Sequence, residues 1–129
     1  MPRKRKAKDL LWSTSDYYGN QITLGAETWD THVLMGHPEM SAYGPLVKQT
    51  VEQPYEIRES TQSATALAFA SAPGTGPSPE GIRVLVNYAD MYFAKGATSG
   101  AVMTAYPVDI GKFGNPRLGK TIYRKGGGK

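Results

Sequence analysis

The chain of 129 residues contains no cysteine. This absence excludes disulfide bonds, thiolate metal sites and a cysteine nucleophile. Long apolar runs are missing too, because stretches such as residues 82–86 are far shorter than the roughly 20 residues that a membrane-spanning helix needs. No apolar segment follows the basic N-terminus before Tyr17, so we expect no signal peptide. We therefore expect a soluble protein that does not enter a membrane.

Two common signature loops are also missing, although the chain has 15 glycines. Neither the Gly-Thr-Gly of residues 74–76 nor the three glycines of residues 126–128 follows a strand and opens a helix with the Lys-Ser/Thr pair of a phosphate-binding loop. No Gly-x-Ser-x-Gly motif occurs, so the usual serine-hydrolase elbow is absent.

The charges are unevenly distributed along the chain. The formal net charge is +4, but residues 1–8 hold five basic residues and residues 112–129 hold six, without an acid in either segment. Residues 9–111 keep four basic residues against all eleven acids, which gives this part a net charge of −7. Basic ends of this kind bind phosphate backbones without sequence preference, or they only add solubility.

The patterning predicts one α+β domain, with N-terminal helices packed on a four-stranded antiparallel sheet. We expect a basic N-terminal arm over residues 1–27, the domain over residues 28–112 and a basic, Gly-rich tail over residues 113–129. An extended segment is predicted at 28–35, helices from Pro38 and over 45–53, and strands at 55–60, 65–71, 82–88 and 100–106. Residues 72–81, rich in Gly and Pro, are expected to be a flexible hairpin loop or linker.

The only two histidines, His32 and His37, are five residues apart. Histidine is the side chain whose ordinary pKa suits proton transfer near neutral pH. Asp30 or Glu39 could complete a metal site with them, but no recognised zinc spacing is present, so we expect neither a metal nor another cofactor. A structural or surface role for each histidine also fits. His37 is the stronger candidate, because a helix start at Pro38 would add backbone N–H groups that favour a phosphate.

Three charged residues could assist a histidine. Glu39 is either a first-turn glutamate or a base that orients His37. Lys48 or Arg58 could stabilise the charge on a phosphate, although Lys48 also suits a solvated helix face and Arg58 could simply pair with Glu56.

Thr104 and Tyr106 lie two apart on a predicted strand, so their side chains should point to the same side. A hydroxyl can bond a base edge and a tyrosine ring can stack on a base. The alternative is an ordinary half-buried strand, where such residues are common.

These motifs in their order resemble a known family. The run Trp-Asp-Thr-His-Val-Leu-Met-Gly-His-Pro-Glu at 29–39 is followed by a helix ending at Pro54, by three strands and by Thr104-Ala105-Tyr106-Pro107. This order over residues 28–112 resembles the phage-associated branch of the barnase–EndoU–colicin–RelE superfamily of nucleases and toxins. The resemblance implies helices before a four-stranded antiparallel sheet, and metal-free RNA cleavage by 2′-hydroxyl attack to give a 2′,3′-cyclic phosphate.

The resemblance also implies a set of site residues and partners. His37 and His32 would exchange protons with help from Glu39, Lys48 or Arg58 would offset charge, and Thr104 and Tyr106 would hold the nucleotide. RNA is then the expected partner, with a cognate inhibitor or phage protein as a further one, and the site of action is the cytoplasm of a bacterial host or delivery by a phage or effector carrier. The alternatives are a non-catalytic nucleic-acid-binding or viral structural protein that uses its basic tails, and a protein-interaction module.

Overall fold

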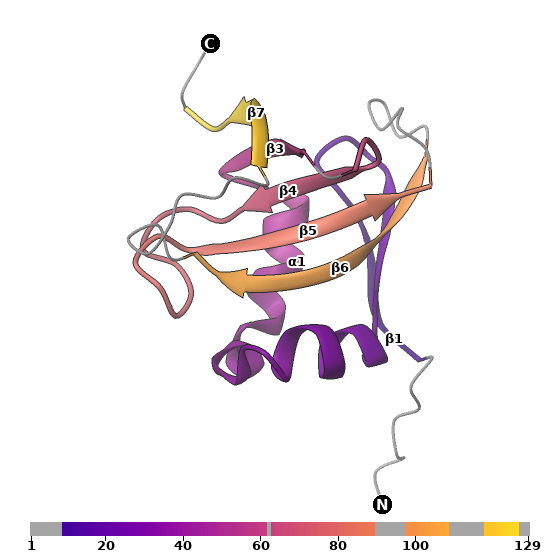
Figure 1. Ribbon diagram of the computed structural model, residues 1–129, viewed down its shortest axis with the longest axis vertical. Helices are drawn as coiled ribbons and strands as arrows, with labels where there is room; N and C mark the ends of the chain where they lie inside the picture. The colour runs from indigo at the N-terminus through magenta and orange to yellow at the C-terminus, as the bar shows by residue number, and fades with distance from the viewer. Residues whose placement is uncertain (1–8, 62, 90–97, 109–117, 127–129) are drawn as a thin grey trace, which may run out of the picture.

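Seven strands form one mixed sheet in the part of the chain that the computed structural model describes, residues 9–61, 63–89, 98–108 and 118–126 (Figure 1). The strands are β1 (Leu10–Ser15), β2 (Gln21–Gly25), β3 (Glu56–Ser60), β4 (Ala66–Ala70), β5 (Ile82–Tyr88), β6 (Ser99–Pro107) and β7 (Leu118–Arg124). Their order across the sheet is β1-β2-β6-β5-β4-β3-β7. The β2–β6 pair is parallel, and the other neighbours are antiparallel.

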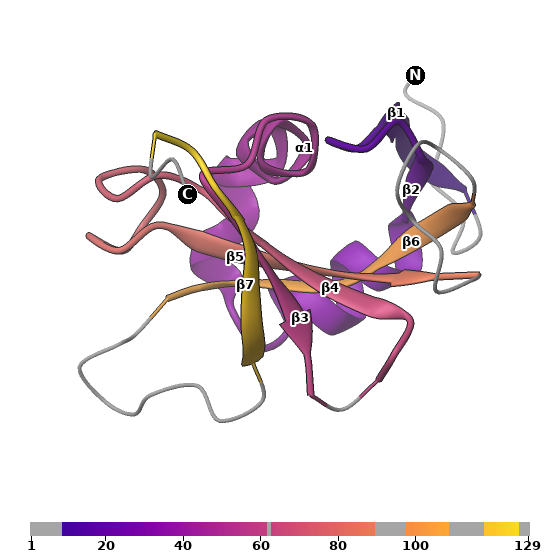
Figure 2. The same cartoon turned by 90° about the horizontal axis from the view of Figure 1, so that it is seen from above.

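Three helical segments connect β2 to β3. They are the π-helical η1 (Thr28–Leu34), the 3₁₀-helical η2 (Pro38–Tyr43) and the α-helix α1 (Gly44–Glu52). Pro45 suits the first turn of α1 because its missing N–H would have no helical partner there, and Pro54 follows the helix end. The helix predicted over 45–53 is therefore confirmed. α1 packs on one face of the sheet (Figure 2).

The predicted fold class, N-terminal helices on a four-stranded antiparallel sheet, is wrong. The described chain has one short α-helix, which follows two strands, and a sheet of seven strands that includes a parallel pair. The four predicted strands do form, as β3 to β6. The difference comes from the ends of the chain: β1 and β2 lie in the segment expected to be an arm, and β7 lies in the expected tail. Residues 1–8 lie outside the described residues.

The β1–β2 hairpin forms because its alternating side chains are buried and its turn is tied by a carboxylate. Ile22 and Leu24 are fully buried on β2. Asp16, 5% exposed, accepts hydrogen bonds from the backbone N–H groups of Tyr18 and Asn20, each at 2.8 Å, and from the Asn20 amide. The Tyr88 hydroxyl of β5 also donates to Asp16, at 2.5 Å. One carboxylate thus closes the turn and fixes it to the centre of the sheet.

The sheet curls so that both of its edges approach α1 (Figure 2). The N–H of Tyr17, in the β1–β2 turn, donates to the carbonyl of Val51 in α1 at 3.1 Å. The Tyr17 ring lies 4.3 Å, centroid to centroid, from that of Tyr123 in β7. Strands from the two ends of the chain therefore meet beside the C-terminal end of α1.

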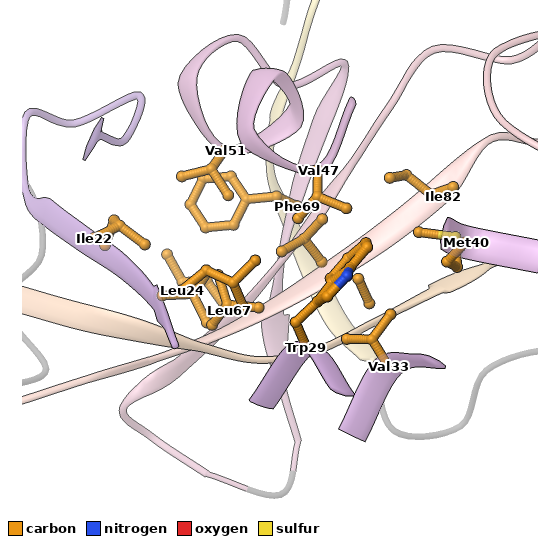
Figure 3. Packing of buried hydrophobic residues seen from close by; sticks show 14 of the residues in the cluster. Ile22, Leu24, Trp29, Val33, Met40, Val47, Val51, Leu67, Phe69 and Ile82 are labelled. Atoms are coloured by element: carbon orange, nitrogen blue, oxygen red, sulfur yellow. The ribbon is translucent and has the colours of Figure 1, made fainter. Parts of the chain in front are cut away.

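The segment 28–35, predicted to be extended, is instead helical. Trp29 and Val33 are both buried, and residues four apart share one face of a helix rather than alternating faces of a strand. Figure 3 shows these two side chains beside Met40 and Val47. The core lies between this layer and the face of the sheet that carries Val84 of β5. We call the opposite face, with Arg83 and Leu85 of β5, the outer face.

Candidate functional site

The histidines lie along the edge of β6, where β2 ceases to cover it. β2 pairs only with residues 99–101 of β6 before the chain turns into η1. η1 then packs beside the rest of β6, and the Thr104 hydroxyl donates to the His32 carbonyl oxygen at 2.7 Å. This hydrogen bond joins two residues 72 positions apart and holds η1, which carries His32 and leads to His37, against the strand.

The backbone of His37 is held on both sides while its ring stays accessible. Its N–H donates to the Val33 carbonyl at 2.8 Å, and its own carbonyl accepts from Met40 at 2.9 Å. Val33 and Met40 are fully buried, so they anchor the segment in the core. The His37 side chain is 42% exposed. A rigid backbone under an accessible imidazole suits a proton-transfer group.

Around the His37 ring lie a carboxylate and an aromatic ring. His37 Nδ1 is 3.3 Å from Glu39 Oε2. The Tyr106 ring lies 6.1 Å from the His37 ring, centroid to centroid, at an interplanar angle of 34°. A neutral His37 that donates its Nδ1–H to Glu39 presents the lone pair of Nε2 to a substrate. The structure thus brings together His37, Glu39 and Tyr106, with Thr104 and the His32 backbone beside them.

Glu39 is charged at neutral pH in this setting. A hydrogen bond from its own backbone N–H is the main cause that lowers the pKa of the Glu39 carboxyl; desolvation opposes it, and the hydrogen bond and charge of His37 add smaller lowering effects. The carboxylate can therefore accept the Nδ1–H of His37 and hold the ring in the tautomer that presents Nε2 to a substrate.

Arg83 is the cation nearest in register to this cluster, and it is not among the residues predicted from the sequence. Arg83 of β5 is the direct cross-strand partner of Tyr106, so both side chains emerge on the outer face. The structure shows no carboxylate paired with Arg83 among the described residues. In the sequence, Arg83 is a single arginine among Ile82, Val84 and Val86. Only the register between β5 and β6 shows that it lies opposite Tyr106.

Two of the predicted site residues lie elsewhere. Lys48 pairs with Glu52 on α1 at 3.0 Å, and Glu52 also accepts a hydrogen bond from Thr14 of β1. Arg58 donates to Glu56 at 2.5 Å on β3. β3 is three strands from β6, or about 14 Å at the usual strand spacing. Neither cation is placed beside His37.

Within the described ranges, no group of three or more histidine, aspartate or glutamate side chains could hold a metal ion. The described residues also contain no helix that is long and apolar enough to cross a membrane. A pocket of about 140 Å³ lies between α1 and the β4–β5 loop and includes none of the predicted site residues. The His37 cluster lies at the β6 edge, with its two charged side chains about half-exposed.

Comparisons with known proteins do not place this chain in a family. No family model matches the sequence. No curated protein matches it, and no solved structure matches its fold. The function proposed for this chain consequently depends on the geometry of the described residues.

Proposed function

We propose that the chain is a metal-independent endoribonuclease whose catalytic group is His37. The observation that carries this proposal is the position of the half-exposed His37 ring between the Glu39 carboxylate and the Tyr106 ring at the β6 edge. Two features from distant parts of the sequence, the His-Pro-Glu turn and the Thr-x-Tyr strand, thus form one cluster. It combines a proton carrier, an orienting carboxylate and an aromatic surface.

The reaction that these groups suit is transesterification of RNA. His37 Nε2 takes the proton of the ribose 2′-hydroxyl as the 2′-oxygen attacks phosphorus. The bond from phosphorus to the 5′-oxygen breaks, that oxygen receives a proton, and a 2′,3′-cyclic phosphate remains. We assign the second proton to His32, which is exposed on η1 and whose carbonyl oxygen accepts a hydrogen bond from Thr104.

The developing charge on the phosphate requires a cation, and Arg83 is the residue best placed to supply it. Its guanidinium leaves β5 on the same face as the Tyr106 side chain. Planar guanidinium groups bind two phosphate oxygens at once, which stabilises the extra negative charge of the transition state. We therefore propose that Arg83, rather than the predicted Lys48 or Arg58, stabilises the charge on the phosphate.

Tyr106 and Thr104 would position the nucleotide. The Tyr106 ring can stack on a base, a contact that does not depend on the base's identity. The Thr104 hydroxyl already donates its proton to His32, so it can serve the substrate only as an acceptor. Since residues 9–111 carry a net charge of −7, attraction to RNA would come from the basic residues of the two ends.

Cleavage of a single-stranded RNA oligonucleotide in EDTA tests the proposal. The wild-type protein should cut the RNA and leave a 2′,3′-cyclic phosphate, detectable by mass spectrometry. An oligonucleotide with 2′-deoxyribose at every position should stay intact, because the attacking group is missing. Cleavage of both polymers, or activity that EDTA abolishes, would contradict the mechanism. Salt-dependent RNA binding without any cleavage would support the non-catalytic alternative.

A further inference from the structure

The β4–β5 loop is folded against α1 and forms one wall of a polar pocket. Within residues 72–81, the Gly74 N–H donates to the Pro79 carbonyl at 2.7 Å and the Gly81 N–H to that of Ser78 at 3.0 Å. Gly76 has a φ of +82°, and a Cβ there would lie 2.9 Å from Ile82 and 3.3 Å from Leu46. Loops of this length with their own internal hydrogen bonds are often functional.

The pocket has room for one small group only. Its volume is about 140 Å³, well below the roughly 300–1,000 Å³ of pockets that enclose a drug-sized ligand. Nine residues line it: Leu46, Gln49, Thr50, Gln53, Tyr55, Ser71, Ala72, Thr75 and Lys125. This size fits a single ring system, such as the base of one nucleotide whose sugar and phosphate remain outside, better than a complete metabolite.

The lining side chains differ in their capacity to bind a ligand. Three hydroxyls already donate or accept within the protein: Thr50 donates to the Leu46 carbonyl, and Thr75 donates to Ser71, which accepts from the Ile82 N–H. By contrast, the amides of Gln49 and Gln53 and the ammonium of Lys125 form no side-chain hydrogen bond to the residues that the structure describes.

Backbone hydrogen bonds hold the segments that carry these available groups. Gln49 and Gln53 are four residues apart, one at the last turn of α1 and one just after it, and the N–H of Gln53 donates to the Gln49 carbonyl at 2.7 Å. The N–H of Lys125 donates to the Tyr55 carbonyl at 2.7 Å, which extends the pairing of β7 with β3 past Arg124. Two amides, a half-buried tyrosine and a lysine therefore converge from separate elements.

The chemistry of the lining favours a nucleotide. Each glutamine amide offers both a donor and an acceptor, as the edges of nucleobases do, whereas the carboxylate of an acidic peptide would use the donors alone. The lining contains Lys125 and no acidic residue, although residues 9–111 are acidic overall. A tyrosine beside the amides provides an aromatic surface for a base.

We propose that this pocket binds one nucleotide of a single-stranded nucleic acid. The base lies against Gln49, Gln53 and Tyr55, and the phosphate lies at Lys125. The subsite shares no residue with the His37 cluster, so it stands whether or not His37 cleaves RNA.

Nucleoside 5′-monophosphates test the subsite, because they contain no internucleotide bond for a nuclease to cut. Titrated into the ¹⁵N-labelled full chain, they should produce saturable shifts of the amide signals of Gln53, Thr75 and Lys125. We expect dissociation constants of about a millimolar, as for a weak contact of a few hydrogen bonds. A combined Gln49→Leu and Gln53→Leu variant should weaken binding at least tenfold, and Lys125→Ala several-fold.

Matched control variants distinguish binding in the pocket from non-specific electrostatic attraction of the nucleotide to the protein. Gln21→Leu on β2 and Lys120→Ala on β7 remove the same groups outside the pocket and should leave the dissociation constant unchanged. The proposal is overturned if the backbone amide signals of Gln53, Thr75 and Lys125 show no saturable shift, or if the shifts map to residues 1–8 instead. It is also overturned if the double glutamine variant binds nucleotides as tightly as the wild type does. Equal shifts with hexaglutamate would assign the pocket to acidic peptides.

Discussion

The molecule contains two polar clusters that use similar groups in opposite ways. At the β1–β2 turn, the Asp16 carboxylate is 5% exposed and accepts four hydrogen bonds from Tyr18, Asn20 and Tyr88. At the β6 edge, the His37 and Glu39 side chains are 42% and 48% exposed and share one contact of 3.3 Å. Both clusters connect elements far apart in the sequence.

This difference separates a structural cluster from one that can react. A buried carboxylate whose lone pairs are all used stabilises the fold and has nothing left for a substrate. An exposed imidazole with one orienting partner contributes little to stability, but its second nitrogen remains accessible. Changes in the first cluster should therefore affect unfolding, and changes in the second should affect chemistry.

The largest expected effect on stability comes from Asp16→Ala. Three residues would lose a buried hydrogen-bond acceptor, and each buried donor left without a partner costs about 1–3 kcal/mol. We expect the free energy of unfolding, measured by urea denaturation, to fall by about 3–5 kcal/mol. Glu27→Ala, at an exposed position after β2, is the control, and equal losses in both variants would contradict the structural role of Asp16.

Arg83→Ala should lower the rate of RNA cleavage by about 10–100-fold, or about 1.4–2.7 kcal/mol of transition-state free energy. Lys48→Ala is the matched control, because Lys48 pairs with Glu52 on α1 and should leave the rate within about twofold. Single-turnover assays with saturating protein measure both rates. A larger loss in Lys48→Ala than in Arg83→Ala would restore the assignment made from the sequence.

Glu56 should make the stability of the sheet depend on pH. Burial raises the pKa of the Glu56 carboxyl, but hydrogen bonds and charges from Arg58 and Arg124 outweigh it, so the folded-state pKa is lowered. A lowered folded-state pKa means that this stabilisation is complete above the unfolded-state pKa near 4.5 and is lost as the pH falls through the folded-state value.

Glu56→Gln should consequently reduce the free energy of unfolding by about 1–2 kcal/mol at pH 7 and by less at pH 3. Urea denaturation at the two pH values measures this difference. Glu59→Gln, an exposed residue of the same strand, is the control and should show little effect at pH 7. If Glu56→Gln lost more unfolding free energy at pH 3 than at pH 7, the folded-state pKa of Glu56 would be raised rather than lowered, which would contradict this prediction.

The smallest expected effect is that of Tyr88→Phe, which removes only the hydroxyl that donates to Asp16. We expect a loss of about 1 kcal/mol in the free energy of unfolding, with RNA cleavage unchanged. Tyr106→Phe is the matched control at the other cluster, because it also removes only a hydroxyl and retains the ring beside His37. A change in cleavage rate caused by Tyr88→Phe would mean that the two clusters are coupled.

The sequence predicted local elements better than their assembly. Alternation identified Ile82–Tyr88 as a strand, and the pair of prolines bounded α1, because these signals lie within a few residues. The parallel pairing of β2 with β6 and the pairing of β3 with β7 depend on contacts across most of the chain. No local pattern encodes such contacts, so the sheet was predicted with three strands too few.

The residues of the candidate site were chosen from local signals as well, so the sequence could not say which of them lie together. His37, Glu39, Thr104 and Tyr106 were chosen by residue type, and the structure brings them together. Lys48 and Arg58 were chosen in the same way, but their ion partners, Glu52 and Glu56, lie within four residues of them and hold them elsewhere. Arg83 could be recognised only from the register that places it opposite Tyr106.

The rate of RNA cleavage by His37→Ala tests most directly whether the β6 edge is catalytic. Loss of a general acid or base lowers rates by about 10²–10⁴, and we expect a loss of that size with the unfolding temperature changed by no more than about 2 °C, since the side chain is half-exposed. His37→Ala that cleaves RNA at the wild-type rate, or a folded wild-type protein that cleaves no RNA, would contradict this role.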